Sequence, residues 1–167
     1  LSLPEKAIDV LFVGTLDHNK GVDRLLKLVA ALPQVKFAVV GHGPMQQQLV
    51  AAAAQCQNLQ LLSSQSPTGL KSYFEQSKCL ISLSRNESFG LVMTEAMACY
   101  TPVIATETDG SKAQVVHGVN GFCLAQLGEA ELHLALAEAI QQLLRFSSAE
   151  YQQIQQACRT RATPYFV

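Results

Sequence analysis

Short apolar segments rich in β-branched residues alternate along this chain with longer amphipathic segments. Residues 8–13 and 35–40 are of the first kind, and residues 21–32 between them carry apolar side chains at nearly helical spacing before Pro33. A strand, a helix and a second strand form the unit of a parallel sheet, because the helix returns the chain to the end of the sheet where the first strand began and the second strand then runs in the same direction. The alternation therefore predicts an α/β fold: a doubly wound, mostly parallel six-stranded sheet with helices on both faces.

The same pattern gives approximate bounds for the elements. The predicted strands are residues 8–13, 35–40, 58–62, 79–83, 101–105 and 121–124. The predicted helices are residues 21–32, 44–55, 67–76, 91–99, a short helix after Gly110 and Ser111, 129–144 and 148–160. In such a sheet the ligand lies beyond the carboxyl ends of the strands, near the switch in strand order. We therefore expect the site in the loops that leave these strands.

Length and composition agree with a single folded unit. The chain has 167 residues, of which 49% are hydrophobic and 15% are charged. This length matches one domain with one sizeable core, so we expect residues 1–167 to form a single domain. Twelve Lys and Arg face thirteen Asp and Glu, for a net charge of −1. Because no basic field is available to hold a phosphate backbone, nucleic acid is not an expected partner.

Targeting and membrane signals are absent from the sequence. Residues 1–6 have no basic segment followed by an apolar one, and no apolar run approaches the roughly 18 residues of a membrane span. The five cysteines form no C-x-x-C pair, and we expect them to be buried free thiols in a reducing cytoplasm. The chain opens on Leu1 and reaches a strand-like segment by Ile8, so we expect a piece of a longer protein.

The strongest local signal is the segment from Glu87 to Glu95, which leaves a predicted strand and enters a predicted helix. With Ser88 as the N-cap, the amides of Phe89, Gly90 and Leu91 would face outward at the helix start, where they and the helix dipole favour an anion such as phosphate. Gly90 would let a ligand approach the backbone.

The two carboxylates of this segment suggest a ligand with hydroxyls on both sides of a phosphate. Glu87 would lie at the loop tip and Glu95 about two turns further along the helix, inclined to the same side. A sugar nucleotide has this order of parts. The alternative is that Glu87 precedes a helix because acids are favoured there and that Glu95 is solvated. Glu95 stands in an apolar stretch, which indicates a polar partner for it.

Two further loops follow the first two predicted strands. Residues 14–21 contain Lys20, which would meet a phosphate or simply be solvated. Residues 41–44 form a tight turn, but a dinucleotide fingerprint would need a third glycine at Gln46 and would normally follow the first strand. A nicotinamide dehydrogenase is therefore weakly supported.

Together these segments resemble the nucleotide-binding carboxyl-terminal domain of retaining glycosyltransferases of the GT-B fold, family 4. The resemblance runs from Val10 to about Leu124. Its motifs are Phe12-Val13-Gly14, Lys20-Gly21-Val22-Asp23, Gly41-His42-Gly43-Pro44, Glu87-Ser88-Phe89-Gly90-Leu91, Glu95-Ala96-Met97-Ala98 and Thr101-Pro102-Val103-Ile104-Ala105. The resemblance implies a Rossmann-like domain that is one half of a GT-B fold.

The resemblance also implies residue roles. Glu87 would contact the donor sugar and Glu95 the nucleotide ribose, while Lys20 and the loop amides hold the diphosphate. Glu87 and Lys20 are then the candidate catalytic residues. The candidate donor-binding residues are Gly14, Thr15, Lys20, Gly43, Ser88, Phe89, Gly90, Leu91 and Glu95.

The implied activity is retaining glycosyl transfer from a UDP- or GDP-linked sugar, with no cofactor and no bound metal, since helix-start amides and Lys20 would stabilise the leaving diphosphate. The acceptor would be a glycan or lipid-linked molecule, as in polysaccharide or lipopolysaccharide biosynthesis. It would be held by an amino-terminal domain absent from this chain, so the isolated domain would be nearly inactive. We expect a cytoplasmic parent protein, with peripheral association at the cytoplasmic face of the membrane as an open alternative.

Three residues depart from the family pattern. Thr15 stands where an arginine is common, which removes a cation from the diphosphate site; Arg85 is a possible substitute or an exposed loop arginine. Tyr100 replaces a glycine and would affect packing. Gln114 stands where the family often has Glu, which indicates a different sugar or none.

Several alternatives stay open. One is a non-catalytic nucleotide-sugar-binding module, consistent with Thr15 and Gln114. Another is a sugar-nucleotide epimerase of similar fold. Ser88 lacks the glycine two residues earlier that a hydrolase nucleophile needs. The four histidines lie in separate segments without metal-ligand spacing, so no metal site is expected.

Overall fold

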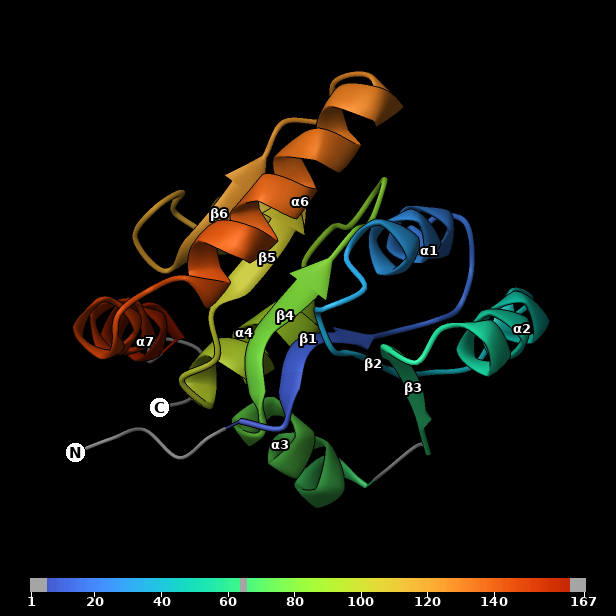
Figure 1. The fold of residues 1–167 in the computed structure, drawn as a ribbon. Coiled ribbons are helices and arrows are strands. Elements are labelled where there is room, and N and C mark those ends of the chain that lie inside the picture. Colours follow the sequence, from blue (N-terminus) through green and yellow to red (C-terminus); the bar gives the residue numbers. More distant parts are fainter. Residues whose placement is uncertain (1–5, 64–65, 163–167) are drawn as a thin grey trace.

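The computed structural model describes residues 6–63 and 66–162 and confirms the α/β fold (Figure 1). Its strands are β1 (Ile8–Val13), β2 (Phe37–Val40), β3 (Leu59–Leu62), β4 (Ser77–Ser82), β5 (Val103–Thr106) and β6 (Gly121–Leu124). Its helices are α1 (Val22–Ala31), α2 (Gln46–Gln55), α3 (Pro67–Glu75), α4 (Leu91–Ala98), α5 (Asp109–Gln114), α6 (Glu129–Leu144) and α7 (Ser148–Ala162).

All six strands are parallel and lie in the order β3-β2-β1-β4-β5-β6. The chain builds outward from β1 in one direction, then crosses back to place β4 on the other side of β1. In the register of these two central strands, Leu11 is opposite Leu80. The switch in strand order therefore lies between β1 and β4, and their carboxyl ends flank it.

Successive residues of the central strands feed two different cores, because side chains alternate across a strand. Val10 and Phe12 of β1 pack in the cluster that includes residues of α1, α2 and α6, whereas Leu11 packs in the cluster that includes residues of α3, α4 and α7. Figure 1 shows these two groups of helices on opposite faces of the sheet. Burial on both faces explains why the strand sequences are almost continuously apolar.

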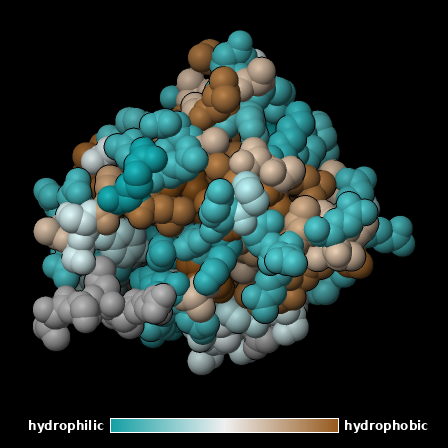
Figure 2. Space-filling model, viewed as in Figure 1, coloured by the Kyte–Doolittle hydropathy of each residue, from teal (hydrophilic) through white to brown (hydrophobic). Residues whose placement is uncertain are grey.

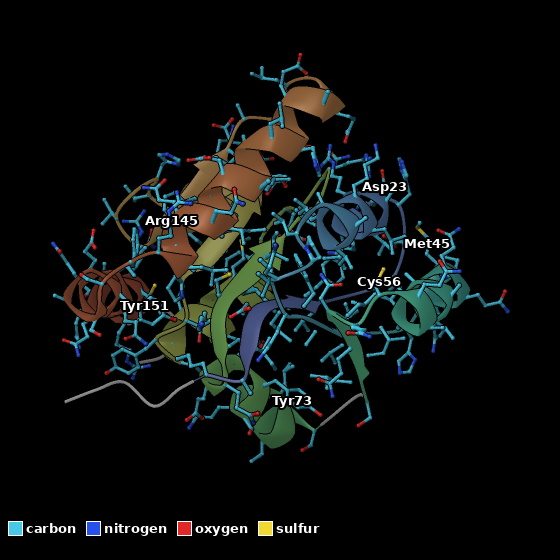
Figure 3. All side chains as sticks on the ribbon, in the orientation of Figure 1. Asp23, Met45, Cys56, Tyr73, Arg145 and Tyr151 are labelled. Atoms are coloured by element: carbon cyan, nitrogen blue, oxygen red, sulfur yellow. The ribbon has the colours of Figure 1, made fainter. Side chains whose placement is uncertain are left out.

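Helix α7 contributes to both cores: Tyr151 and Ile154 belong to the first cluster, and Cys158 and Ala162 to the second. The hydroxyl of its Tyr151, labelled in Figure 3, donates a hydrogen bond to the Lys78 carbonyl of β4 at 2.6 Å. In the same helix, Cys158 is fully buried, and burial raises the pKa of its thiol to about 12. The thiol therefore stays protonated near neutral pH and acts in packing.

The remaining cysteines only partly match the expectation of buried thiols. Cys79 is buried, but Cys56, Cys99 and Cys123 are half-buried. The expectation of five buried cysteines is therefore wrong for these three. All five are free thiols.

Element ends differ from the sequence-based bounds where tertiary hydrogen bonds intervene. Pro44 lies outside α2, which begins at Gln46, because the amide of Met45 donates to the Leu16 carbonyl at 2.8 Å and ties this turn to the neighbouring loop. Strand β5 begins at Val103, and the hydroxyl of Thr101 just before it donates to the Phe74 carbonyl at 2.8 Å. Residues 1–5, on which part of the amino-terminal expectation falls, lie outside the described residues.

The surface is largely hydrophilic in the view of Figure 2, with hydrophobic side chains showing between polar ones and at the tip of the molecule above α6. Leu127 and Leu134, just before and within α6, are 71% and 69% exposed. Over the two described stretches of the chain, no helix is both long enough and apolar enough to cross a bilayer.

Candidate functional site

A cavity of about 300 Å³ lies where the sheet topology predicts a ligand. Its walls come from the carboxyl-terminal parts of β1 and β4, the loop of residues 83–90 that follows β4, and the first turn of α4. Lys20 reaches the cavity from the loop between β1 and α1. Segments about 70 residues apart in sequence thus meet at the switch between the central strands.

The only charged residues that line this cavity in the described structure are Lys20 and Glu87, and they pair with each other. The Lys20 ammonium donates to Glu87 Oε2, and the Ser84 hydroxyl lies 3.4 Å from the same oxygen. A turn sets the position of Lys20, because its amide donates to Asp17 Oδ1 at 2.8 Å. The two residues predicted to be catalytic are therefore side by side at the cavity.

Helix α4 begins differently from the prediction. Gly90, with φ of 80°, is its N-cap residue and makes no side-chain cap; Ser88 is exposed and lies two residues further out. The assignment of Ser88 as the N-cap is therefore wrong. A left-handed conformation favours glycine, which explains how the chain turns sharply from the loop into the helix.

This shift of the cap changes which amides lie at the helix start. In the described structure the amides of Gly90, Leu91 and Val92 donate to no protein group, whereas the amide of Met93 donates to the Gly90 carbonyl at 3.0 Å. All three of these residues line the cavity. Amides at a helix start that donate no hydrogen bond within the protein attract anions, and here they adjoin a cavity that is also lined by a lysine.

Gln114 proves to be a buried contact of the loop and not a cavity residue. It is 1% exposed at the end of α5, and its Nε2 donates to the carbonyls of Phe89 at 2.5 Å and Gly90 at 3.3 Å. This position does not support the expectation that Gln114, in place of Glu, indicates a different donor sugar or none. Glycine at 110 makes room for the same loop, because a Cβ there would lie 2.4 Å from the Phe89 carbonyl oxygen.

The other end of the loop is held by residues that the sequence did not reveal. Gln126, just before α6, donates to the carbonyls of Ser84 at 3.2 Å and Arg85 at 3.0 Å. Its Oε1 accepts from the buried Arg24 of α1, which also donates to the Leu83 carbonyl at 3.0 Å. In the sequence, Arg24 among the apolar positions of the predicted helix was the one sign of such a contact, and nothing around Gln126 indicated its role.

Arg85 does not replace the missing cation at Thr15. Its guanidinium makes a two-pronged contact with the carboxylate of Asp23, at 2.9 and 2.8 Å, on α1 (Asp23 is labelled in Figure 3). This hydrogen bonding holds the pKa of Asp23 below its usual range. Arg85 is half-buried, so the expectation of an exposed loop arginine is wrong; it lies outside the cavity lining, which does not support a role as the substitute cation.

Glu95 lies one turn of α4 beyond Leu91, outside the residues that line the cavity. It is half-buried, and its carboxylate makes no hydrogen bond or ion pair with other described residues. Burial raises the pKa of its carboxyl group. The predicted polar partner within the protein is therefore absent from the described structure, and of the two acids only Glu87 lies at the cavity.

The remaining predicted ligands divide between the cavity and its surroundings. Gly14, Phe89 and Leu91 line it, and the latter two side chains are 46% and 62% exposed. Thr15 is exposed outside the lining. Gly43 is also outside, packed against the Leu16 backbone so closely that a Cβ would lie 2.6 Å from its carbonyl oxygen. Among the described residues, no three His, Cys, Asp or Glu side chains gather in a way that could hold a metal ion.

Comparison with known sequences gives a family match over nearly the whole chain. The model of the family described as glycosyl transferases group 1 matches residues 1–161. The D-inositol 3-phosphate glycosyltransferase of Mycobacterium leprae is 35% identical over 157 residues, which are 89% of this chain and 36% of that protein.

Comparison of structures gives the same picture. Sucrose-phosphate synthase from Thermosynechococcus elongatus is 29% identical, with a TM-score of 0.83 over 98% of this chain and 42% of that one. The pneumococcal O-GlcNAc transferase GtfA, solved in complex with UDP and GlcNAc, is 22% identical, with a TM-score of 0.82 over 96% of this chain and 33% of that one. The chain thus spans 33% to 42% of the length of these three proteins.

Proposed function

The chain belongs to the glycosyl transferases group 1 family, as its motifs predict, and we propose that it binds the donor of a retaining, metal-independent glycosyl transfer. The donor is a nucleotide-diphosphate sugar, linked to UDP or GDP. Among the structural neighbours, the pneumococcal transferase was solved with UDP, which makes UDP the first nucleotide to test.

The observation that carries this proposal is the meeting of Lys20, Glu87 and the α4 amides at one cavity. The ammonium group and the amides of Gly90, Leu91 and Val92 are cationic or partly positive groups suited to a diphosphate. In the transfer step the diphosphate leaves with the bonding electrons, and these donors stabilise its charge. Glu87, as a hydrogen-bond acceptor beside them, orients the hydroxyls of the sugar.

Glu95 is proposed to accept hydrogen bonds from the ribose of the nucleotide. Its position on α4, one turn beyond the cavity residue Leu91, extends the site along the helix. An acid that burial has made harder to ionise gains from new hydroxyl donors. A ligand that spans from Glu87 to Glu95 would therefore lie across the start of α4.

We further propose that the acceptor is a glycan or lipid-linked molecule bound by an amino-terminal domain of the same protein. The matched relatives are longer than this chain, and the one from Mycobacterium leprae is named for transfer to an inositol phosphate. The setting we propose is cytoplasmic polysaccharide or lipopolysaccharide assembly, with the parent at the cytoplasmic face of the membrane.

A second candidate function is a nucleotide-sugar-binding module without catalysis. It is favoured by the electrostatics of the cavity: in the described structure Lys20 is its one lining cation, and Glu87 already pairs with that cation. Arg85, which would strengthen the anion site, is bound to Asp23. A diphosphate held by one lysine and backbone amides would bind but depart less readily.

Binding is tested by titrating the 167-residue chain with UDP, GDP and ADP in thermal-shift and calorimetric measurements. We expect a nucleotide-dependent rise in the melting temperature that Lys20→Ala abolishes and Glu95→Ala reduces. Lys27→Ala, an exposed lysine of α1 outside the cavity, is the matched control and keeps the wild-type response. No response to any of the three at millimolar concentration would contradict donor binding.

Catalysis is tested in the protein that contains this domain. Glu87→Ala should lower the rate of sugar transfer by a factor on the order of a hundred, the range for loss of an important transition-state contact. Nucleotide binding that persists while wild-type transfer is undetectable would favour the non-catalytic module.

A further inference from the structure

Gln114 occupies a place that the proposed donor site does not explain by direct contact. It is buried on α5, outside the cavity lining, yet its amide reaches two consecutive carbonyls of the loop that carries the site. Its Oε1 accepts a hydrogen bond from the hydroxyl of Thr94, which is itself buried on α4. Gln114 thus links the end of α5, the middle of α4 and the Phe89–Gly90 segment.

The direction of these bonds fixes two peptide units. In a trans peptide the carbonyl and the amide hydrogen point in opposite directions, and every peptide bond of the described structure is trans. The Phe89 carbonyl points at Gln114, so the amide of Gly90 in the same peptide unit points away from Gln114. The Gly90 carbonyl also points at Gln114, so the amide of Leu91 points away from it as well. Gly90 and Leu91 line the cavity whereas Gln114 does not, which is consistent with these two amides facing the cavity.

The loop needs such an external constraint. Gly90 has the widest choice of backbone conformations of any residue type, so its own preferences do not select the one observed. The side chains of Phe89 and Leu91 are 46% and 62% exposed. The Gly90 carbonyl also accepts from the Met93 amide at 3.0 Å. Gln114 therefore supplies the constraint chiefly at the Phe89 carbonyl.

We propose that Gln114 is a positioning residue for the anion site: by holding the Phe89 and Gly90 carbonyls, it directs the Gly90 and Leu91 amides at the diphosphate of the donor. The role requires a hydrogen-bond donor at Nε2, which a carboxylate cannot be. Glutamine at this position is then suited to the present loop, and replacement by Glu would set a carboxylate against two carbonyl oxygens. This inference rests on the proposed function.

The first experiment makes the same chemical exchange at two carboxamides in different parts of the fold. Gln114→Glu replaces a carboxamide that donates to two backbone carbonyls, and so does Asn58→Asp, because Asn58 Nδ2 donates to the Val29 and Leu32 carbonyls at 3.0 and 2.9 Å before β3. Both variants should melt at lower temperature. Only Gln114→Glu should weaken UDP binding in calorimetry, by about tenfold or more, the scale of one lost hydrogen bond to a charged group.

A second pair of variants keeps the test decisive if Gln114→Glu fails to fold. Thr94→Val has the same shape but removes the hydroxyl that holds Gln114, and Thr94→Ser retains that hydroxyl. We expect weaker UDP binding by Thr94→Val and near wild-type binding by Thr94→Ser. In NMR spectra of the free chain, Thr94→Val should shift the Gly90 and Leu91 amide signals and reduce their response to UDP.

The outcomes separate this inference from the proposed function. If the wild-type chain binds no nucleotide, donor binding itself fails. If the wild type binds UDP and Thr94→Val, Gln114→Glu and Asn58→Asp all bind it equally well, the donor site stands and the positioning role of Gln114 is wrong. Equal weakening by Gln114→Glu and Asn58→Asp, in proportion to lost stability, also overturns that role.

Discussion

At the scale of single residues, the pairing of Lys20 with Glu87 affects how strongly the cavity binds an anion. The ammonium that would bind a diphosphate is in contact with a carboxylate that repels one. Each side chain keeps some exposure, 29% for Lys20 and 20% for Glu87, so solvent moderates but does not remove the repulsion.

The pair leads to a prediction of opposite effects on two measurements. Glu87→Gln removes the negative charge but keeps the shape, so UDP should bind about fivefold more tightly, the effect of about 1 kcal/mol of relieved repulsion. Under the proposed function, sugar transfer by a protein that contains this domain should nevertheless fall, because the acceptor for the sugar hydroxyls is weakened. Calorimetry and an initial-rate assay measure the two effects.

The control for this prediction is Glu138→Gln, an exposed acid of α6 that lies far from the cavity in sequence and outside its lining. It should change neither quantity. Weaker UDP binding by Glu87→Gln would show that the carboxylate supports the anion site and does not compete with it.

Residue roles could be predicted where a local pattern carries them. Lys20 and Glu87 stand in loops that end central strands, and both line the cavity. The Ser88 cap was wrong because serine is a good N-cap by propensity, whereas the loop turns through the left-handed Gly90. Gln126 and Arg24 escaped detection because their contact joins positions 102 residues apart, which no local pattern encodes.

At the scale of elements, the end of α4 stores backbone strain. Tyr100 follows this helix with φ of 61°, the only positive φ of a non-glycine residue in the described structure. Its ring lies 5.9 Å from the Arg159 guanidinium of α7, which offsets part of the strain. The glycine that the family usually has here explains the conformation, because glycine adopts it without a steric penalty.

A pair of substitutions isolates this strain. Tyr100→Gly and Tyr100→Ala both remove the ring, so their difference in unfolding free energy reports the backbone alone. We expect Gly to be more stable than Ala by about 1 kcal/mol, the cost of the left-handed conformation with a Cβ. Urea denaturation measures the difference.

Ala98→Gly, in the last turn of α4, serves as the reference, because glycine in ordinary helical geometry is less stable than alanine. If the Tyr100→Gly variant were also less stable than the Tyr100→Ala variant, residue 100 would have left the left-handed conformation.

The existence and order of the elements could be predicted because each has a simple period and a clear break. Strand β6 and helix α6 match the predicted bounds, 121–124 and 129–144. The bounds of α2 and β5 do not, since Met45 and Thr101 are held by hydrogen bonds to distant backbone groups. Such hydrogen bonds depend on the packing of the whole fold and cannot be predicted from a short segment of sequence.

At the scale of the whole molecule, two ion pairs tie the halves of the sheet together near the cavity. Arg85, in the loop after β4, binds Asp23 of α1; Arg24 of α1 binds Glu129 of α6. Hydrogen bonds from these arginines lower the pKa of both carboxyl groups. The folded state therefore binds protons less readily than the unfolded chain, so these pairs stabilise the fold above about pH 4.5 and cease to do so as the pH falls.

This linkage predicts how Asp23→Asn behaves. Near neutral pH the variant should unfold with a free energy lower by about 1 kcal/mol, the value for a two-pronged but partly exposed pair. The gap should close as the pH falls below the ordinary pKa of an aspartate, because Asp23 of the wild type, whose pKa is lowered by Arg85, is then progressively protonated. Urea titrations at several pH values measure it.

Glu138→Gln again provides the comparison, because Glu138 is 69% exposed and lies 3.9 Å from Arg145. Its effect on stability should be small at every pH. A gap for Asp23→Asn that stays constant with pH would mean that the charge of Asp23 does not contribute to the fold.

The overall architecture was the most predictable level. The strand-helix alternation and the apolar strands are enough for a parallel sheet, and the family motifs agree with the observed order. The cavity's position follows from that order. What could not be predicted is which polar side chains brace the loops, because any buried amide of suitable reach would satisfy the same carbonyls.

The close packing of backbone against backbone around the cavity has a consequence for engineering. A Cβ at Gly21 would lie 2.2 Å from the Leu83 carbonyl oxygen, and one at Gly110 would lie 2.4 Å from that of Phe89. Insertions or bulkier residues at these glycines would push the walls apart. A library meant to change donor preference should therefore keep them fixed and vary the exposed side chains of Thr15, Phe89 and Leu91, where new shapes cost the scaffold little.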